Sequence, residues 1–567
     1  MISFDNSPTL YWIGGIFLFS STALLSITPS LPHQRVKNDG IVWIAFLLQL
    51  VLLVYLRLPI IVFNEALNPD ENLFIVGAMT LAESPLYWES VDGCTSGPFN
   101  FYIITVFCEI FDQPYDYISA RIVGILLLSG SFFFSFLALR IIFNASIALL
   151  SIFPATAFMG LTRHWDFINF SSEHLPMFLL SIMLYLFVSI HKSNLPIQKT
   201  QVFTFGLMAG CVIFTKLQAI PIAFSLTLIG YWLIYQKQRN LELLTNALLL
   251  TIGGLIPIVI LVLIGYQYNF LDKIWIFYIE NNLAYGKEGH GLIHSVYASF
   301  SDPINFFIRA TLVLSIILLI YNVVFKRQLK PTMLWSLMTV FILSTIASVY
   351  KTGFMFHHYL LFLIFPVVFL FAFFLRNVAE YSKSYIVIGF STLATIYTIA
   401  QTSTILFTNY FISSDKPQRP LSISETGHQI LKYSNPDESL VIWGDAGRLY
   451  LETKRTQGVR WSNSHWGMYS DSLQKNFQKE FILELKEKPF PIFVDAHPTK
   501  NTFMTRDKLG YETNKELKEY IDSKYQFIGE FDEQRVFVHK ERLEEMNVTK
   551  YNKNATSACV AFLIESI

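Results

Sequence analysis

The 567-residue chain has little charge and little cysteine. Only 15% of its residues are Asp, Glu, Lys or Arg, against roughly 25% in soluble proteins. Acidic and basic residues number 42 each, so no net charge attracts nucleic acid. The four cysteines lack the spacing of a metal site. Two of them, Cys94 and Cys108, could form a disulfide in an exported loop or stay reduced.

Apolar sequence is abundant instead. Hydrophobic residues make up 53% of the chain, including 52 Phe, and repeated runs of about 20 apolar residues are long enough to cross a membrane. The first run follows Asp5 rather than a basic segment, so we expect a retained span and not a cleaved signal peptide. The pattern predicts a polytopic α-helical membrane protein with about 12 spans. The predicted spans are 10–29, 41–63, 118–141, 145–161, 175–191, 202–216, 219–235, 243–265, 304–325, 333–350, 358–375 and 384–408.

Lysine and arginine in the short loops predict the orientation of these spans. If the N-terminus lies outside, every inner connection is basic, as the positive-inside rule requires. These connections carry Arg35, Lys37, Arg140, Lys192, Lys199, Lys237, Arg239, Lys326, Arg327, Lys330, Arg376 and Lys383. The outer side then receives the loops 64–117 and 266–303 and everything after about residue 411. In the first loop we expect two short interfacial helices, 70–83 and 99–111.

The composition becomes polar and charged after about residue 411. Strand patterns at 440–443, 491–494 and 535–538 surround a helical pattern at 514–523, which predicts a small α/β domain. We therefore expect a transmembrane domain over 1–411, which includes the interfacial helices of loop 64–117. An extracytoplasmic soluble domain would occupy 412–567, poorly ordered from Asn547 onward.

This topology gathers the unusual charges on the outer side. They are Asp70, Glu71, Arg121, Arg163, His164, Asp166, Glu173, His174, Lys216, Lys351, His357 and His358. Outer cations at helix ends oppose the positive-inside tendency, and an anionic ligand would explain them. Cations can stabilise the charge on a departing phosphate, while a carboxylate takes a proton from an attacking hydroxyl. Such a set suits a phosphate substrate with a lipid tail. Arg57, inside the second span, is expected to reach the headgroups by snorkelling.

The order of these motifs resembles the GT-C glycosyltransferases of family 39, which use lipid-phosphate sugars. The group includes the protein O-mannosyltransferases and the aminoarabinose transferase acting on lipid A. The matching positions, best over 41–375, are Asp70-Glu71, Ser96-Gly97-Pro98, Arg121, Glu173 or Asp166, Gly206 to Lys216 with Gln218, and His358-Tyr359. Two departures stand out. An extra span precedes the usual first one, and Ser96-Gly97-Pro98 replaces a Lys-Pro-Pro motif.

The resemblance implies a GT-C fold and a membrane enzyme. The chain lacks the long inserted outer-loop domain of the eukaryotic mannosyltransferases, which favours a bacterial plasma membrane over an endoplasmic reticulum membrane. The donor of the enzyme would be a polyprenyl-phosphate monosaccharide, and its acceptor a lipid, glycan or protein. The catalytic residues would be Asp70 as general base, Glu71 and Glu173. Substrate-binding residues would be Arg121, Asp166, Lys216, Gln218, Lys351, His358 and Tyr359. A divalent cation could be held by Asp70, Glu71, Glu173 and His174, although relatives differ in metal dependence.

Structural explanations compete with each of these roles. Asp70 and Glu173 could cap helices, and Arg121 could snorkel to the headgroups. A transporter or flippase would also have many spans, but its charges usually lie near the bilayer midplane. An outer-face ligase that joins preformed glycans would share the topology and differ in its product.

Overall fold

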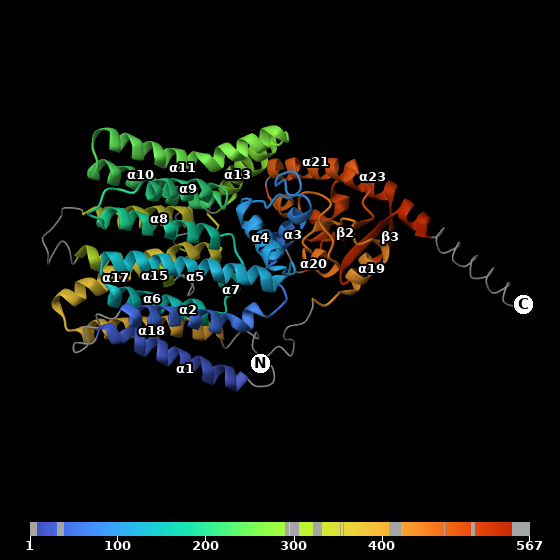
Figure 1. Cartoon of the computed structure of the whole chain (residues 1–567). Helices are drawn as coiled ribbons and strands as arrows, with labels where there is room; N and C mark the ends of the chain where they lie inside the picture. The colour runs from blue at the N-terminus through green and yellow to red at the C-terminus, as the bar shows by residue number, and fades with distance from the viewer. Residues whose placement is uncertain are drawn as a thin grey trace, which may run out of the picture. The chain divides into compact units, whose positions relative to one another are not determined.

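The chain forms two compact units in a computed structural model (Figure 1). The first unit comprises Met1–Glu71 and Thr95–Arg419, and the second comprises Asn72–Cys94 and Pro420–Ile567. The structure describes residues 8–30, 39–289, 294, 297, 306–320, 332–351, 353–354, 356–406, 421–469, 471–500 and 505–546. The predicted disorder from Asn547 onward lies outside the described residues.

The first unit is a helical bundle (Figure 1). Each predicted span coincides with a helix: α1 (Pro8–Ile27), α2 (Asp39–Ile61), α5 (Tyr117–Ile142), α6 (Ala145–Leu161), α8 (His174–Lys192), α9 (Lys199–Ile213), α10 (Ile220–Lys237), α11 (Asn240–Gln267), α15 (Phe306–Ile320), α16 (Met333–Tyr350), α17 (Ile364–Tyr381) and α18 (Ser384–Leu406). Among the described residues, 8 helices are long and apolar enough to cross a membrane, whereas α6, α9, α15 and α18 provide shorter apolar segments. The protein is a multi-pass membrane protein, and the number of crossings stays a prediction.

Large apolar side chains cover the outside of this bundle. On α1, Leu10, Ile16 and Phe17 are exposed, as lipid-facing residues would be. The opposite face of α1 packs on α2, where the rings of Tyr11 and Tyr55 stack at 5.1 Å. The Tyr11 hydroxyl also donates to a backbone carbonyl of α2. The additional N-terminal span is therefore an integral part of the bundle.

Glycines allow α9 and α11 to approach closely. A Cβ atom on Gly206 would lie 2.1 Å from the carbonyl oxygen of Leu250. One on Gly210 would lie 2.3 Å from the carbonyl oxygen of Gly254. Small residues at such contacts are typical of packed membrane helices. The packing fixes the end of α9 and so the turn that carries Lys216.

The loops predicted to lie outside contain more helix than the sequence predicts. The two expected short helices are confirmed as α3 (Pro69–Glu83) and α4 (Phe99–Phe111). The segment 266–303, expected to be a loop, contains α12 (Leu271–Lys273), the π-helix η3 (Ile274–Glu280) and α13 (Asn281–Glu288). Tyr278 of η3 is buried and donates to the carbonyl of Ile213 at 2.7 Å. Burial of aromatic residues orders a segment that composition alone marks as irregular.

The second unit contains the predicted α/β fold. Its sheet has the order β1-β2-β4-β3, with β1 (Val441–Gly444) parallel to β2 (Ile492–Ala496) and β4 (Gln534–His539) antiparallel to both of its neighbours. The strand β3 (Tyr525–Phe531) is not predicted by the sequence, and it joins β4 through Asp532 and Glu533, both at positive φ. The accompanying helices are α19 (Glu425–Tyr433), α20 (Arg448–Thr453), α21 (Asp471–Glu487), α22 (Arg506–Leu509) and α23 (Lys515–Lys524).

The second unit also includes Asn72–Cys94, unlike the division expected from the sequence. Backbone and side-chain hydrogen bonds explain this assignment. The amide of Asp92 donates to the carbonyl of Arg460 at 2.6 Å, and the Gln457 side chain donates to the carbonyl of Ser90 at 3.0 Å. Cys94 and Cys108 both keep their thiols, so the disulfide considered from the sequence does not form.

Candidate active site

The N-terminal end of α3 presents one exposed and one buried acid. Asp70 is exposed, whereas Glu71 is fully buried. Asn68 organises this turn because its Oδ1 accepts from the Asp70 amide at 2.9 Å, while its Nδ2 donates to Asp166 Oδ1 at 2.7 Å. The Asn68 side chain thus fixes the backbone of exposed Asp70 beside the buried Glu71 and links it to Asp166.

Glu71 forms a buried, two-pronged ion pair with Arg121 of α5. Arg121 Nε and Nη2 donate to the two carboxylate oxygens at 2.8 and 2.6 Å. The remaining donors of Arg121 bind the carbonyls of Ile60, Phe63 and Glu65. The guanidinium has five N–H donors, and these contacts occupy them with protein groups. Arg121 therefore fixes the entrance of α3 and is already saturated as a donor.

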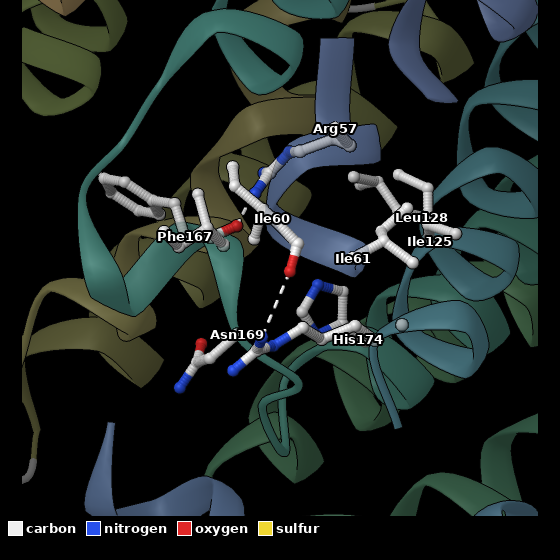
Figure 2. A pocket seen from close by; sticks show the side chains of 11 residues that line it. Arg57, Ile60, Ile61, Ile125, Leu128, Phe167, Asn169 and His174 are labelled. Atoms are coloured by element: carbon white, nitrogen blue, oxygen red, sulfur yellow. Dashed lines mark hydrogen bonds between the residues drawn. The ribbon is translucent and has the colours of Figure 1, made fainter. Parts of the chain in front are cut away.

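A cavity of about 20 Å³ lies beside this pair (Figure 2). Arg57, Asn169 and His174 line it, and the longer dashed line marks the hydrogen bond that Arg121 donates to the Ile60 carbonyl. This space holds about one water molecule and no substrate. The expectation that Arg57 snorkels is wrong, because its side chain is buried and donates to the carbonyls of Met159 and Phe167 at 2.6 Å.

Glu173 and Lys216 form a second buried ion pair. Lys216 Nζ donates to Glu173 and, at 2.8 Å, to the Ser172 hydroxyl. It also lies 4.8 Å from the centre of the Tyr359 ring, a cation–π distance. Burial alone raises the pKa of the Glu173 carboxyl, but the charges of Lys216 and His358 outweigh burial and lower the pKa to about 2. The Glu173 carboxyl is therefore ionised at neutral pH.

The Ser96-Gly97-Pro98 loop holds the turn that carries Lys216. Ser96 forms an isolated antiparallel bridge with Lys216, and the Gly97 amide donates to the Thr215 carbonyl at 2.8 Å. A Cβ on Gly97 would lie 2.3 Å from the carbonyl oxygen of Phe214. Glycine is needed here because the two backbones touch. The loop positions Lys216 rather than supplying a lysine of its own.

Asp166 lies between Asn68, which holds the Asp70 backbone, and the histidines near the Glu173–Lys216 pair. Its Oδ1 lies 3.7 Å from His358 Nδ1, and its Oδ2 lies 3.7 Å from His357 Nδ1. His358 Nε2 lies 3.9 Å from Glu173 Oε1. Five sequence-predicted side chains thus lie together, and Asp70 is tied to them by its backbone amide through Asn68. We call this set the polar cluster: Asp70, Asp166, Glu173, Lys216, His358 and Tyr359.

Two predicted substrate-binding residues, Lys351 and Gln218, are not part of the polar cluster. Lys351 is exposed at the C-terminal end of α16. The Gln218 side chain donates to the carbonyl of Ser348 at 2.9 Å, which ties the Lys216 turn to α16. The described contacts give Gln218 a structural role and leave Lys351 outside the polar cluster.

The metal set expected from Asp70, Glu71, Glu173 and His174 does not form. Glu71 pairs with Arg121, Glu173 pairs with Lys216, and the His174 ring accepts from the amide of Ser171 at 3.1 Å. In the described ranges, the group with suitable spacing is His164, Asp166 and His357. Their proximity could not be read from the sequence, because more than 190 positions separate His357 from the other two.

No protein-family model and no curated protein matches the chain. ArnT from Cupriavidus metallidurans, solved with bound undecaprenyl phosphate, matches with a TM-score of 0.50 and 13% identity, covering 87% of this chain and 97% of ArnT. Its apo structure gives a TM-score of 0.51 and 12% identity over the same shares.

The chain has the fold of ArnT. Because ArnT is an aminoarabinose transferase with the GT-C fold, the predicted fold class is confirmed. An oligosaccharyltransferase from Archaeoglobus fulgidus also matches, with 11% identity and a TM-score of 0.43, over 94% of this chain and 74% of its own.

Proposed function

We propose that the protein is an inverting glycosyltransferase. It would move one monosaccharide from a polyprenyl-phosphate carrier to an acceptor at the outer face of the membrane. The observation that carries this proposal is the convergence of Asp166, His358 and the Glu173–Lys216 pair, to which Asn68 ties the backbone of exposed Asp70. The shared fold with ArnT, which was solved with bound undecaprenyl phosphate, supports a lipid-phosphate donor.

In this mechanism Asp70 acts as the general base. Its carboxylate takes the proton of an acceptor hydroxyl as that oxygen bonds to the anomeric carbon of the sugar. The bond between the anomeric carbon and the phosphate oxygen breaks, and the phosphate leaves on its lipid. Lys216 would stabilise the charge on the leaving phosphate. His358 and Tyr359 lie close enough to Glu173 and Lys216 to contact the same group.

Other predicted site residues receive positioning roles. Glu71 and Arg121 fix the first turn of α3, which holds Asp70. Glu173 orients the Lys216 ammonium, and Gln218 anchors the same turn. We keep Lys351 as a candidate for an outer phosphate contact because it is exposed near the His357–Tyr359 segment in sequence.

The remaining parts of the proposal concern location and partners. We infer a bacterial plasma-membrane protein whose second unit lies outside the cytoplasm. The acceptor would be a lipid, a glycan or a protein, and the second unit would help to select it. The basic inner connections of the predicted topology support this orientation.

Two experiments test the function. A strain lacking the protein should accumulate a polyprenyl-phosphate sugar, which identifies the donor for a transfer assay. In that assay Asp70→Asn should lower turnover by about 100-fold or more, since general-base catalysis contributes roughly that factor. The matched control is Asp112→Asn, an exposed Asp at the end of α4. Near-normal turnover of folded Asp70→Asn would exclude the base assignment, and transfer of a whole preformed glycan would indicate a ligase.

A further inference from the structure

A cavity of about 430 Å³ lies in the second unit, beside β3, β4 and α23 (Figure 1). Its volume falls within the roughly 300–1,000 Å³ of small-molecule sites. Four aromatic side chains, one arginine and one aspartate line it: Tyr511, Tyr525, Phe527, Phe537, Arg535 and Asp522. Close-packed interiors hold few voids larger than a water molecule, so a hollow of this size points to a ligand.

The strands β3 and β4 place aromatic rings on one face of the sheet. Tyr525 and Phe527 are two residues apart on β3, so both point to the same side. Phe527 pairs directly with Phe537 of β4, and their ring centres lie 5.3 Å apart. Tyr511, from the 3-10 helix η8 (Tyr511–Thr513), packs edge to face against Phe537 with ring centres 5.2 Å apart. These rings give the cavity a continuous aromatic wall.

The exposed lining residues mark the opening of the cavity. Phe527 keeps 52% of its surface exposed, whereas the other three rings are buried. Asp522, in the last turn of α23, is also exposed. Its ion pair with Lys518 lies on the surface, where such pairs are weak. A ligand can therefore reach both an aromatic face and a carboxylate at this opening.

The charges around the cavity disfavour an acidic ligand. Arg535 is the basic residue of the lining, and both of its Nη atoms already donate to carboxylates. Nη2 donates to Glu512 at 2.7 Å and also to Asp495. Asp522 adds a third carboxylate to the same surroundings. This excess of negative charge would repel an anion, whereas an uncharged ligand with hydroxyl groups can donate to exposed Asp522.

We propose that this cavity binds an uncharged saccharide. A pyranose ring presents C–H bonds on its faces, and these pack on the electron-rich faces of aromatic rings. Its hydroxyl groups lie at the edge and need hydrogen-bond partners such as Asp522. The acceptor of the transfer reaction would then be a neutral glycan. That role rests on the proposed function, whereas saccharide binding by the second unit does not.

Binding of neutral trisaccharides to the full-length protein provides the test. The protein is purified in a detergent without a sugar headgroup, because a maltoside would compete for the cavity. Trisaccharides of glucose, galactose, mannose and N-acetylglucosamine are titrated by calorimetry, with trigalacturonate as the acidic comparison. We expect a neutral trisaccharide to bind, and Phe527→Leu to weaken its binding about tenfold, since loss of one ring contact corresponds to roughly that factor. The exposed position of Phe527 should let the variant fold.

Two further variants and a peptide serve as controls. Leu483→Ala changes an exposed apolar residue on α21 of the same unit, outside the cavity lining, and should bind as the wild type does. Phe527→Tyr keeps the ring and should also bind. A Ser/Thr-rich peptide should not bind, and its binding in place of the trisaccharides would overturn the proposal. So would tighter binding of trigalacturonate, no binding of any neutral trisaccharide, or equal affinities in Phe527→Leu and Leu483→Ala.

The transfer assay separates this site from the proposed function. With a saccharide acceptor, Phe527→Leu should raise the KM for that acceptor severalfold and leave kcat near its wild-type value, because the cavity contributes binding and not chemistry. An unchanged KM would remove the role of the cavity in acceptor binding. Saccharide binding without any transfer would leave the site intact and remove only the proposed function.

Discussion

At the scale of single residues, packing separates two acids that the sequence presents as equals. Asp70 and Glu71 are adjacent in one helix, where successive side chains point roughly 100° apart. One therefore faces outward, while the other is buried against Arg121. The sequence predicts the pair and its location at the start of a helix. It does not predict which acid stays exposed, because that depends on the partner helix.

The same limit applies to the rest of the site. The predicted topology places Glu173, Lys216 and His358 on one side of the membrane, and the structure brings them together. Their pairing depends on how the turn before α8, the turn after α9 and the 3-10 helix that carries His358 pack together. No local sequence pattern predicts this packing. Asn68 is missed for a different reason, since its helix-capping role hides its contact with Asp166.

The Glu173–Lys216 pair leads to a prediction about pH. In the wild type the pKa of Glu173 is about 2, below its ordinary value of 4.5. Ionised Glu173 thus contributes stability above pH 4.5, and this contribution is lost as the pH falls through 2. In Lys216→Met the carboxyl stays buried without its counterion, so its pKa should rise above 4.5. The variant should lose about 3–5 kcal/mol at pH 7.

Thermal unfolding in detergent between pH 7 and pH 3 measures this effect. The difference in unfolding temperature between the wild type and Lys216→Met should shrink as the pH falls, because protonation relieves the unpaired charge in the variant. Lys199→Met, which changes an exposed lysine at the start of α9, serves as the control. A difference that stays constant with pH would contradict the assignment.

At the scale of elements, long apolar runs predict the helices of the bundle, because each must satisfy its backbone polar groups internally when it lies in lipid. Their packing partners are not predicted. The glycine-rich span 202–216 matches a family motif in the sequence, but the close contact of Gly206 and Gly210 with α11 is visible only in the structure. The strand β3 escapes prediction because it has exposed residues along its length and an irregularity near Gly529.

The contact between α9 and α11 predicts the effect of one methyl group. Gly210→Ala places a Cβ 2.3 Å from a backbone carbonyl, which cannot move as a side chain can. The helices must separate, and we expect a loss of about 1–3 kcal/mol. The displaced end of α9 should also lower transfer activity through Lys216.

Gly389→Ala on α18 is the matched control, since among the described residues no atom lies within 4 Å of the point that its Cβ would occupy. Unfolding temperature and transfer rate should both stay near wild type in this variant. Equal behaviour of the two alanine variants would show that the close approach does not limit packing.

At the scale of the whole molecule, the second unit is built from two separate parts of the chain. Asn72–Cys94 belongs with Pro420–Ile567, so the polypeptide passes between the units three times. A change in composition reveals only the last of these passages. The first two fall inside a loop whose residues look like any membrane-proximal segment. Their assignment depends on hydrogen bonds to Gln457 and Arg460, far along the chain.

This arrangement predicts the result of limited proteolysis. If a protease site is inserted directly before Pro420, cleavage should not release the C-terminal fragment. Residues 72–94 remain covalently part of the first fragment and hold the second through buried contacts such as Thr80 with Gln457 and Trp88 with Arg460. Size-exclusion chromatography in mild detergent should show both fragments in one peak, which separates only in denaturant. Release of the fragment on cleavage alone would contradict the two-part unit.

The two-part unit also limits how new proteins could be made from this one by recombination. A chimera that received residues 420–567 from a homologue would keep its own 72–94 segment. The transplanted residues would then pack against a segment from a different sequence, and the contacts between the two parts would not match. Compatible exchange therefore requires both pieces to be transplanted together, as one discontinuous cassette.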